Sequence, residues 1–141
     1  MSLVASSQYL VVRKSEGEFK IKSFQDLDVW KKSHLFVLEI YKMSSSFPQN
    51  ENYGITSQIR RAAVSVPANI AEGFSRRSSL DKNHFYNISL SSLHEVKYYL
   101  ILTQDLGYIQ SNDLLLKSDE IAKMLNGLVA SIKLTYPKKR L

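Results

Sequence analysis

The chain has 141 residues, of which 44% are hydrophobic and 23% charged, so it suits one domain and is too short for two domains with separate cores. The absence of cysteine excludes disulfides, thiolate metal sites and cysteine nucleophiles. The formal charge of +6 permits binding to RNA, to DNA or to an acidic protein, without choosing among them.

Residues 1–23 differ from the rest of the chain. Two short β-favouring runs, residues 9–12 and 19–21, flank a turn-forming segment, and this pattern suits a hairpin or a loosely attached arm. The first run is too short for a secretory signal, and Arg13 follows it instead of preceding it. Because charges interrupt every apolar run well before the ~20 residues of a membrane span, we expect a cytoplasmic protein.

From residue 24 onward the apolar spacing predicts four helices, at about 26–45, 53–73, 79–106 and 112–136. Asp26 or Asp28 is expected to cap the first helix, and Ser79 or Asp81 the third. Pro67 lies inside the second helix and predicts a kink. Short connections between long helices favour an all-α, antiparallel up-down-up-down bundle over residues 24–136. A basic tail, residues 137–141, follows it.

The predicted helices carry more apolar surface than one bundle core needs. On the first helix, two neighbouring apolar faces consist of Trp30, His34, Val37, Leu38 and Tyr41, and of Val29, Phe36, Ile40 and Met43. The second helix adds a surface of small side chains, Val64, Ala68 and Ala71. Phe85 begins the apolar stripe of the third helix, while Tyr98 and Ile101 point the other way. This surplus predicts helices that are covered on more than one side.

Motifs for catalysis or for cofactor binding are missing. The sequence has no glycine-rich phosphate loop and no His-Glu-x-x-His, and the segment 73–75 lacks the second glycine of a nucleophile elbow. His84 and His94 share a helix face but lie ~15 Å apart, too far to share one metal ion within a chain. We therefore expect no enzyme activity, no cofactor and no metal.

A polar stripe follows the second predicted helix beside its apolar stripe. Its members are Gln58, Arg61, Ser65, Asn69 and Glu72. Arg61 has two possible ion-pair partners, Glu95 on the third helix and Glu72. Two interpretations stay open: a hydrogen-bond network that fixes helix register or a subunit contact, or a surface that faces a ligand.

Basic residues gather around the end of the second helix and in the tail. They are Arg60, Arg76, Arg77, Lys82, Lys138, Lys139 and Arg140. Guanidinium groups bind phosphate oxygens in a bidentate manner, and the start of the next helix offers unpaired N–H groups. The set is either a nucleic-acid-binding surface or an ordinary solvated loop. With only Phe74 near the arginines, base-specific reading is not indicated.

Residues 58–73 (QIRRAAVSVPANIAEG) resemble the signature of the bacterial four-helix bundle proteins related to the large-subunit rRNA intervening-sequence protein. The segments 24–30 (FQDLDVW), 92–96 (SLHEV) and 106–109 (LGYI) are similar to other parts of that family, and the resemblance covers about residues 24–134. It implies a homopentameric ring without enzymatic activity. It also implies kinship with the accessory protein of diversity-generating retroelements, which binds nucleic acid and a reverse transcriptase.

Together these patterns predict a non-enzymatic homo-oligomer that binds RNA or another structured nucleic acid through a basic surface. The alternative is an interaction scaffold that docks a polymerase or reverse transcriptase without binding nucleic acid itself. Lys97 departs from the acidic or neutral residue expected after Glu95. It would weaken an intersubunit ion pair or extend the basic surface.

Overall fold

The computed structural model describes residues 11–14 and 17–135, and the four predicted helices are all present. They are α2 (Asp28–Ser44), α3 (Ile55–Ser75), α4 (Ser79–Asp105) and α5 (Asn112–Thr135). A two-stranded antiparallel hairpin, β1 (Val11–Lys14) and β2 (Gly17–Lys20), precedes them. Two short 3-10 helices, η1 (Phe24–Asp26) and η2 (Gln49–Glu51), lie before α2 and before α3.

The entry into α2 differs from the prediction that Asp26 or Asp28 caps it. Asp26 belongs to η1, where its carboxylate accepts the backbone N–H of Lys22 at 2.8 Å and that of Ser23 at 3.1 Å. Ser23 completes this capping box, and Leu27 occupies the N-cap position of α2 without a side-chain hydrogen bond. The helical segment begins with the 3-10 turn at Phe24, two residues before the start predicted from apolar spacing. Ser23 and Asp26 therefore cap this turn and not α2.

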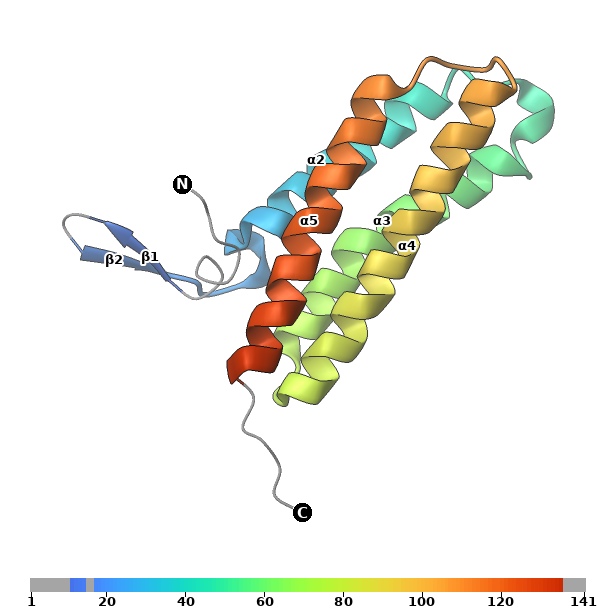
Figure 1. The fold of residues 1–141 in the computed structure, drawn as a ribbon. Helices are drawn as coiled ribbons and strands as arrows, with labels where there is room; N and C mark the ends of the chain where they lie inside the picture. Colours follow the sequence, from blue (N-terminus) through green and yellow to red (C-terminus); the bar gives the residue numbers. More distant parts are fainter. Residues whose placement is uncertain (1–10, 15–16, 136–141) are drawn as a thin grey trace.

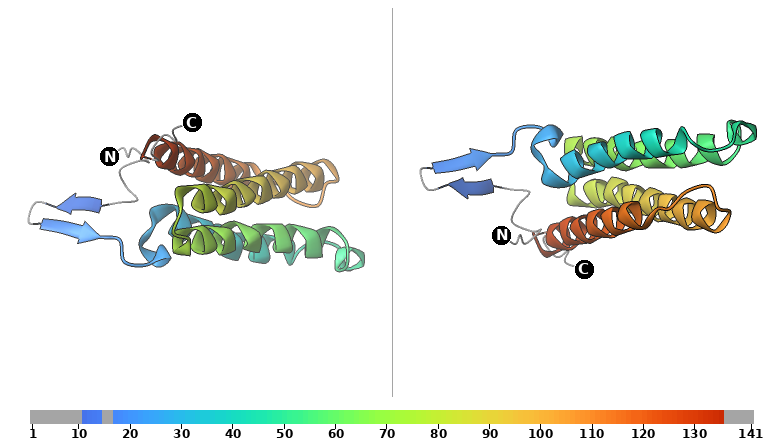
Figure 2. Two further views of the ribbon diagram at one scale, coloured as in Figure 1. Left: turned by 90° about the horizontal axis from the view of Figure 1, so that it is seen from below. Right: turned by 90° about the horizontal axis from the view of Figure 1, so that it is seen from above.

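The four helices lie side by side, and the chain reverses direction at each connection between them (Figure 1). Cross-links join neighbours: Ser89 of α4 donates to the carbonyl of Val66 in α3 at 2.7 Å, and Lys97 of α4 pairs with Asp119 of α5 at 2.8 Å. One end of the bundle carries the α3–α4 turn, the C-terminal end of α5 and the hairpin, as Figure 2 shows. The opposite end carries the connections at 45–54 and 106–111.

The core takes one stripe from each helix. Its largest fully buried apolar side chains are Phe36, Ile40, Ile59, Ile70, Leu93, Leu100, Ile121 and Leu125. On α2, the core uses mainly the second predicted face together with Val37, and His34, Leu38 and Tyr41 of the first face are exposed. On α4, Tyr86 is buried where Phe85 was predicted. Within the described residues, none of the helices has the length and apolar character that crossing a membrane requires.

Candidate nucleic-acid interface

The α3–α4 turn is fixed by close helix packing and by a cap. Gly73 of α3 is buried against Tyr86 of α4, so tightly that a Cβ at position 73 would lie 2.6 Å from the Tyr86 ring. Ser78, and not Ser79 or Asp81, is the N-cap of α4, and its hydroxyl accepts the backbone N–H of Asp81 at 3.0 Å. The helix therefore begins at Ser79, one residue after the serine whose hydroxyl accepts the capping hydrogen bond. Apolar spacing does not show which of the neighbouring serines takes this role.

Two arginines of the predicted basic set are exposed at this turn. The guanidinium of Arg76 forms an ion pair with Glu72 and lies over the Phe85 ring, 4.6 Å from its centroid. Arg77 is exposed and has neither a hydrogen bond nor an ion pair with any other residue in the described part of the chain. Arg77 is thus the arginine of this turn that has no partner among the described residues.

Lys82, by contrast, is turned toward the protein. Its ammonium donates to the carbonyl of Phe74 at 2.8 Å and lies within 3.5 Å of the carbonyl of Gly73. Both acceptors belong to the last turn of α3, where unpaired carbonyls and the helix dipole favour a cation. Burial lowers the pKa of Lys82 below its ordinary value. Lys82 therefore acts as a cap of α3.

Arg60 lies apart from the other predicted basic residues. It is sixteen positions before Arg76, which corresponds to about 24 Å along a helix. Its Nε donates to Ser44 Oγ at 2.8 Å, and its Nη2 donates to the carbonyl of Tyr41 at 3.2 Å. These acceptors are at the C-terminal end of α2. Arg60 thus ties α3 to α2 and does not join the turn.

The predicted basic set therefore does not form one patch. The structure brings Arg76, Arg77 and Lys82 together at the α3–α4 turn and leaves Arg60 in the other half of the bundle. The tail residues Lys138, Lys139 and Arg140 lie outside the described residues.

The polar stripe forms a partial network between α3 and α4. Asn69 donates to Ser65 Oγ at 2.9 Å, and Ser65 shares a hydrogen bond of 2.8 Å with Ser92 of α4. Arg61 donates to Gln58 Oε1 at 2.8 Å. Of these hydrogen bonds, the Ser65–Ser92 pair joins α3 to α4, whereas those of Asn69 and Arg61 lie within α3.

The two carboxylates assigned to the stripe behave differently. Glu72 pairs with Arg76 instead of Arg61. Burial, followed by the nearby Glu95 carboxylate, raises the pKa of Tyr99, while Arg61 acts in the opposite direction. Arg61 and Glu95 thus flank the same tyrosine, but both side chains are exposed. Because neither is buried, no desolvated charge at this stripe requires a partner.

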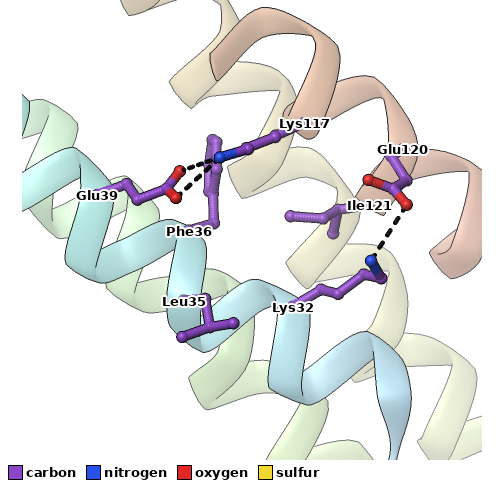
Figure 3. Close-up of a pocket in the computed structure, with 7 residues that line it drawn as sticks. All are labelled: Lys32, Leu35, Phe36, Glu39, Lys117, Glu120 and Ile121. Atoms are coloured by element: carbon purple, nitrogen blue, oxygen red, sulfur yellow. Dashed lines mark hydrogen bonds and ion pairs between the residues drawn. The ribbon is translucent and has the colours of Figure 1, made fainter. Parts of the chain in front are cut away.

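A shallow groove runs between α2 and α5 (Figure 3). Its volume is about 120 Å³, and Leu35, Phe36 and Ile121 supply apolar lining. Two ion pairs bridge the helices beside it: Lys32 with Glu120 at 3.2 Å, and Lys117 with Glu39 at 2.8 Å. Because all four charged groups are substantially exposed, solvent screens both ion pairs and they contribute little to stability.

An aromatic arrangement near the start of α2 was not anticipated as a site. The Trp30 and His34 rings are stacked, with centroids 5.2 Å apart and planes 8° from parallel. Phe24 of η1 meets Trp30 edge to face at 5.2 Å. The sequence signal for this stack is that Trp30 and His34 are four residues apart and so lie on one face of a helix. From apolar spacing, that face was interpreted as part of the core.

Among the described residues, no three histidines, aspartates or glutamates are grouped so that they could hold a metal ion. Lys97, the departure noted in the sequence, pairs with Asp119 at 2.8 Å and therefore has a partner within its own chain.

The fold and this site define an all-helical protein with exposed arginines at one end of four packed helices. The family of 23S rRNA-intervening sequence proteins matches residues 25–127, and the chain belongs to this family. The crystal structure of a protein of unknown function from the S23 ribosomal protein family of Bacteroides thetaiotaomicron is similar, with 27% identity and a TM-score of 0.68. The similarity covers 72% of this chain and 95% of that one. No curated protein matches the chain.

Proposed function

We propose that this protein is a non-enzymatic homo-oligomer that binds RNA or another structured nucleic acid at the end of the bundle that carries the α3–α4 turn. The observation that carries the proposal is the pair Arg76 and Arg77, exposed on a turn whose backbone is fixed by tight packing. Among the described residues Arg77 has no hydrogen-bond or ion-pair partner, so its guanidinium is available to phosphate oxygens. Neither the family description nor that of the structural neighbour names a reaction.

The distribution of charge along the bundle supports this end as the interface. Lys22 and Lys31 are exposed near the start of α2, at the same end as the arginines. The tail with Lys138, Lys139 and Arg140 follows α5, which also finishes at this end. The opposite end carries acidic residues, Glu51, Asp105 and Asp113. The opposite end also has the exposed Lys42, and the arginine end has the exposed Asp28 and Asp81. The support is therefore the excess of basic over acidic residues near the α3–α4 turn, which favours the approach of a polyanion there.

Salt dependence tests the electrostatic mechanism. If each complex neutralises about four phosphates, log affinity falls with log salt concentration at a slope near −3 to −4. Fluorescence anisotropy with a labelled RNA hairpin measures this slope directly. Affinity that is the same at low and high salt contradicts the proposal.

Matched single-charge variants test the location. Arg77→Ala is expected to weaken binding to all sequences about equally and to reduce the salt slope by ~1. Lys42→Ala removes one exposed charge at the opposite end of α2 and is expected to leave the slope unchanged. Equal effects of the two variants would mean that only net charge matters and would refute an interface at the turn.

Assembly is supported by two separate exposed apolar faces. Leu38 is 52% exposed and Val64 42% exposed on the outer side of α2 and α3, and Tyr98 is 57% exposed on α4. A closed ring uses two different faces of each subunit, and the resemblance to the family implies a pentamer. Repetition of the cationic end around a ring would raise avidity without any new contact.

Sedimentation velocity tests the assembly. The unmodified protein is expected to sediment as an oligomer at micromolar concentration. Val64→Glu is expected to give a smaller species, because it places a charge in the proposed contact. Leu116→Glu, at a 68% exposed position on α5, is the control that keeps the oligomer. A folded monomer of the unmodified protein would overturn the proposal.

A second candidate function, a scaffold that docks a protein such as a polymerase or reverse transcriptase, rests on the opposite end. Tyr53 is 98% exposed beside the acidic Glu51, an arrangement that fits a basic protein surface. The ratio of absorbance at 260 and 280 nm of freshly purified protein separates the two functions. A high ratio favours nucleic-acid binding. A ratio typical of protein alone, measured both at low and at high salt during purification, favours the scaffold.

A further inference from the structure

The stacked rings of Trp30 and His34 form a small platform on the first half of α2. Trp30 is half-buried and held by the edge of Phe24, which packs against the core. His34 covers Trp30 with its ring nearly parallel and is itself exposed. A fixed ring thus supports a second ring that solvent can reach. Trp30 packs against the core, and this packing accounts for a large apolar side chain at position 30. The same packing does not require an aromatic ring at position 34.

The platform lies at the cationic end of the bundle. Trp30 is in the first turn of α2, and α2 begins at the same end as the α3–α4 turn (Figure 2). Lys31 and Lys22 are exposed on either side of Phe24 and Trp30 in the chain. Two acidic residues lie close by in the chain: Asp26 of η1, which already accepts two backbone N–H groups, and Asp28, which is exposed in the first turn of α2. Aromatic and cationic groups are therefore combined at one end, which the sequence pattern alone did not indicate.

We propose that the His34–Trp30 stack binds an unpaired base of the nucleic acid by stacking. This inference rests on the proposed function and narrows its ligand to RNA or DNA that presents a single-stranded segment or a loop. Every base has a π-face, so stacking tolerates any sequence. In a duplex both faces of each base are covered by neighbours, and only the backbone remains available. The cationic groups hold the phosphates while the ring accepts the base.

Trp30 is the single tryptophan of the chain. Its fluorescence emission therefore reports on the environment of the platform alone. The experiment titrates the full-length protein with a short single-stranded RNA of mixed sequence and with the same RNA annealed to its complement. It follows Trp30 emission and, separately, the anisotropy of a label on the RNA. The single strand is expected to quench Trp30 emission over the same concentration range as the anisotropy change, whereas the duplex binds without quenching.

Two variants and a matched control locate the stacking ring. His34→Ala is expected to weaken single-strand binding about 5-fold or more, because one base stacked on an aromatic ring contributes ~1–3 kcal/mol. Its affinity for the duplex stays unchanged. His34→Phe keeps an aromatic ring and is expected to restore single-strand affinity. His94→Ala removes an exposed histidine from α4 and is expected to have no effect.

The outcomes separate this inference from the proposed function. Saturable anisotropy without a change in Trp30 emission, or equal quenching by single strand and duplex, overturns the stacking platform and leaves backbone binding intact. If neither RNA binds, the proposed function fails and the platform fails with it. Circular dichroism and thermal melting of each variant confirm that the helices are retained, since His34 is exposed and makes no core contact that folding needs.

Discussion

Replacing Gly73 by alanine tests whether the α3–α4 end is as tightly packed as the structure indicates. Position 73 lies in the last turn of α3, and helix propensity alone favours alanine there by ~1 kcal/mol. The Cβ, however, would lie 2.6 Å and 2.9 Å from two carbon atoms of the Tyr86 ring and 3.2 Å from the carbonyl oxygen of Lys82. Two opposing effects of similar size therefore act at one residue.

The steric effect should prevail. Tyr86 is only 2% exposed, so its ring has no free space to enter, and the carbonyl of Lys82 belongs to the α4 backbone. Overpacking of this kind costs ~1–3 kcal/mol and occasionally more. Because two of the contacts are shorter than 3.0 Å, the steric cost belongs in the upper part of that range. The gain in helix propensity is then subtracted from it. We expect Gly73→Ala to lower the free energy of unfolding by ~1–2 kcal/mol.

Urea denaturation followed by circular dichroism measures this change. Ala68→Gly, at an exposed position of the same helix, is the control and is expected to cost ~0.5–1 kcal/mol through propensity alone. Adding Tyr86→Leu to Gly73→Ala should make the two changes less than additive, because the smaller side chain relieves the contact. A Gly73→Ala protein as stable as the original would refute the packing argument.

Three further predictions concern capping and buried hydrogen bonds. Lys82→Ala is expected to lower the free energy of unfolding by ~1 kcal/mol, because carbonyls of α3 lose a charged donor, while the salt slope of RNA binding measured by anisotropy stays unchanged. Backbone N–H groups lower the pKa of Asp26 below its ordinary value of 3.8, so its stabilising effect is present above about pH 4 and is lost as the pH falls through the lower folded-state pKa. Thermal melts of Asp26→Asn should show a smaller loss of stability on acidification than those of the original protein. Ser89→Ala removes the buried donor to the Val66 carbonyl and should cost ~1 kcal/mol in urea denaturation, whereas Ser91→Ala on the exposed side of α4 should cost little.

The fold was largely predictable because periodicity is a property of local sequence. The four helices, the end of α4 before Gly107 and the location of the connections follow from apolar spacing and from glycine and proline. Helix starts were less predictable. Ser23 with Asp26, and Ser78, satisfy the first N–H groups, and several nearby serines and aspartates fit these roles equally well. Which of the two apolar faces of α2 enters the core depends on neighbouring helices, so it could not be read from α2 alone.

The site was harder to predict, because the sequence does not show whether a basic side chain is bound to another group of the protein or is open to solvent. Arg60, Lys82 and Arg77 look alike along the chain. In the fold, the first two donate to groups at the C-terminal ends of α2 and α3, while Arg77 makes no such hydrogen bond within the described residues. A long basic side chain near a helix C-terminus has a local partner in the last carbonyls, and that competition removes it from a binding surface.

The arrangement of helix ends bears on the proposed binding of nucleic acid at the end that carries the α3–α4 turn. Antiparallel packing brings two helix C-termini and two helix N-termini to one end, so dipole effects nearly cancel there, and the field comes from side chains. Glu72 neutralises part of Arg76, so Arg76 contributes less to that field than Arg77. Under the proposed function, repetition around an oligomer or base stacking on His34 adds to the strength of binding. An isolated subunit that bound duplex RNA tightly at high salt would be incompatible with this distribution of charge.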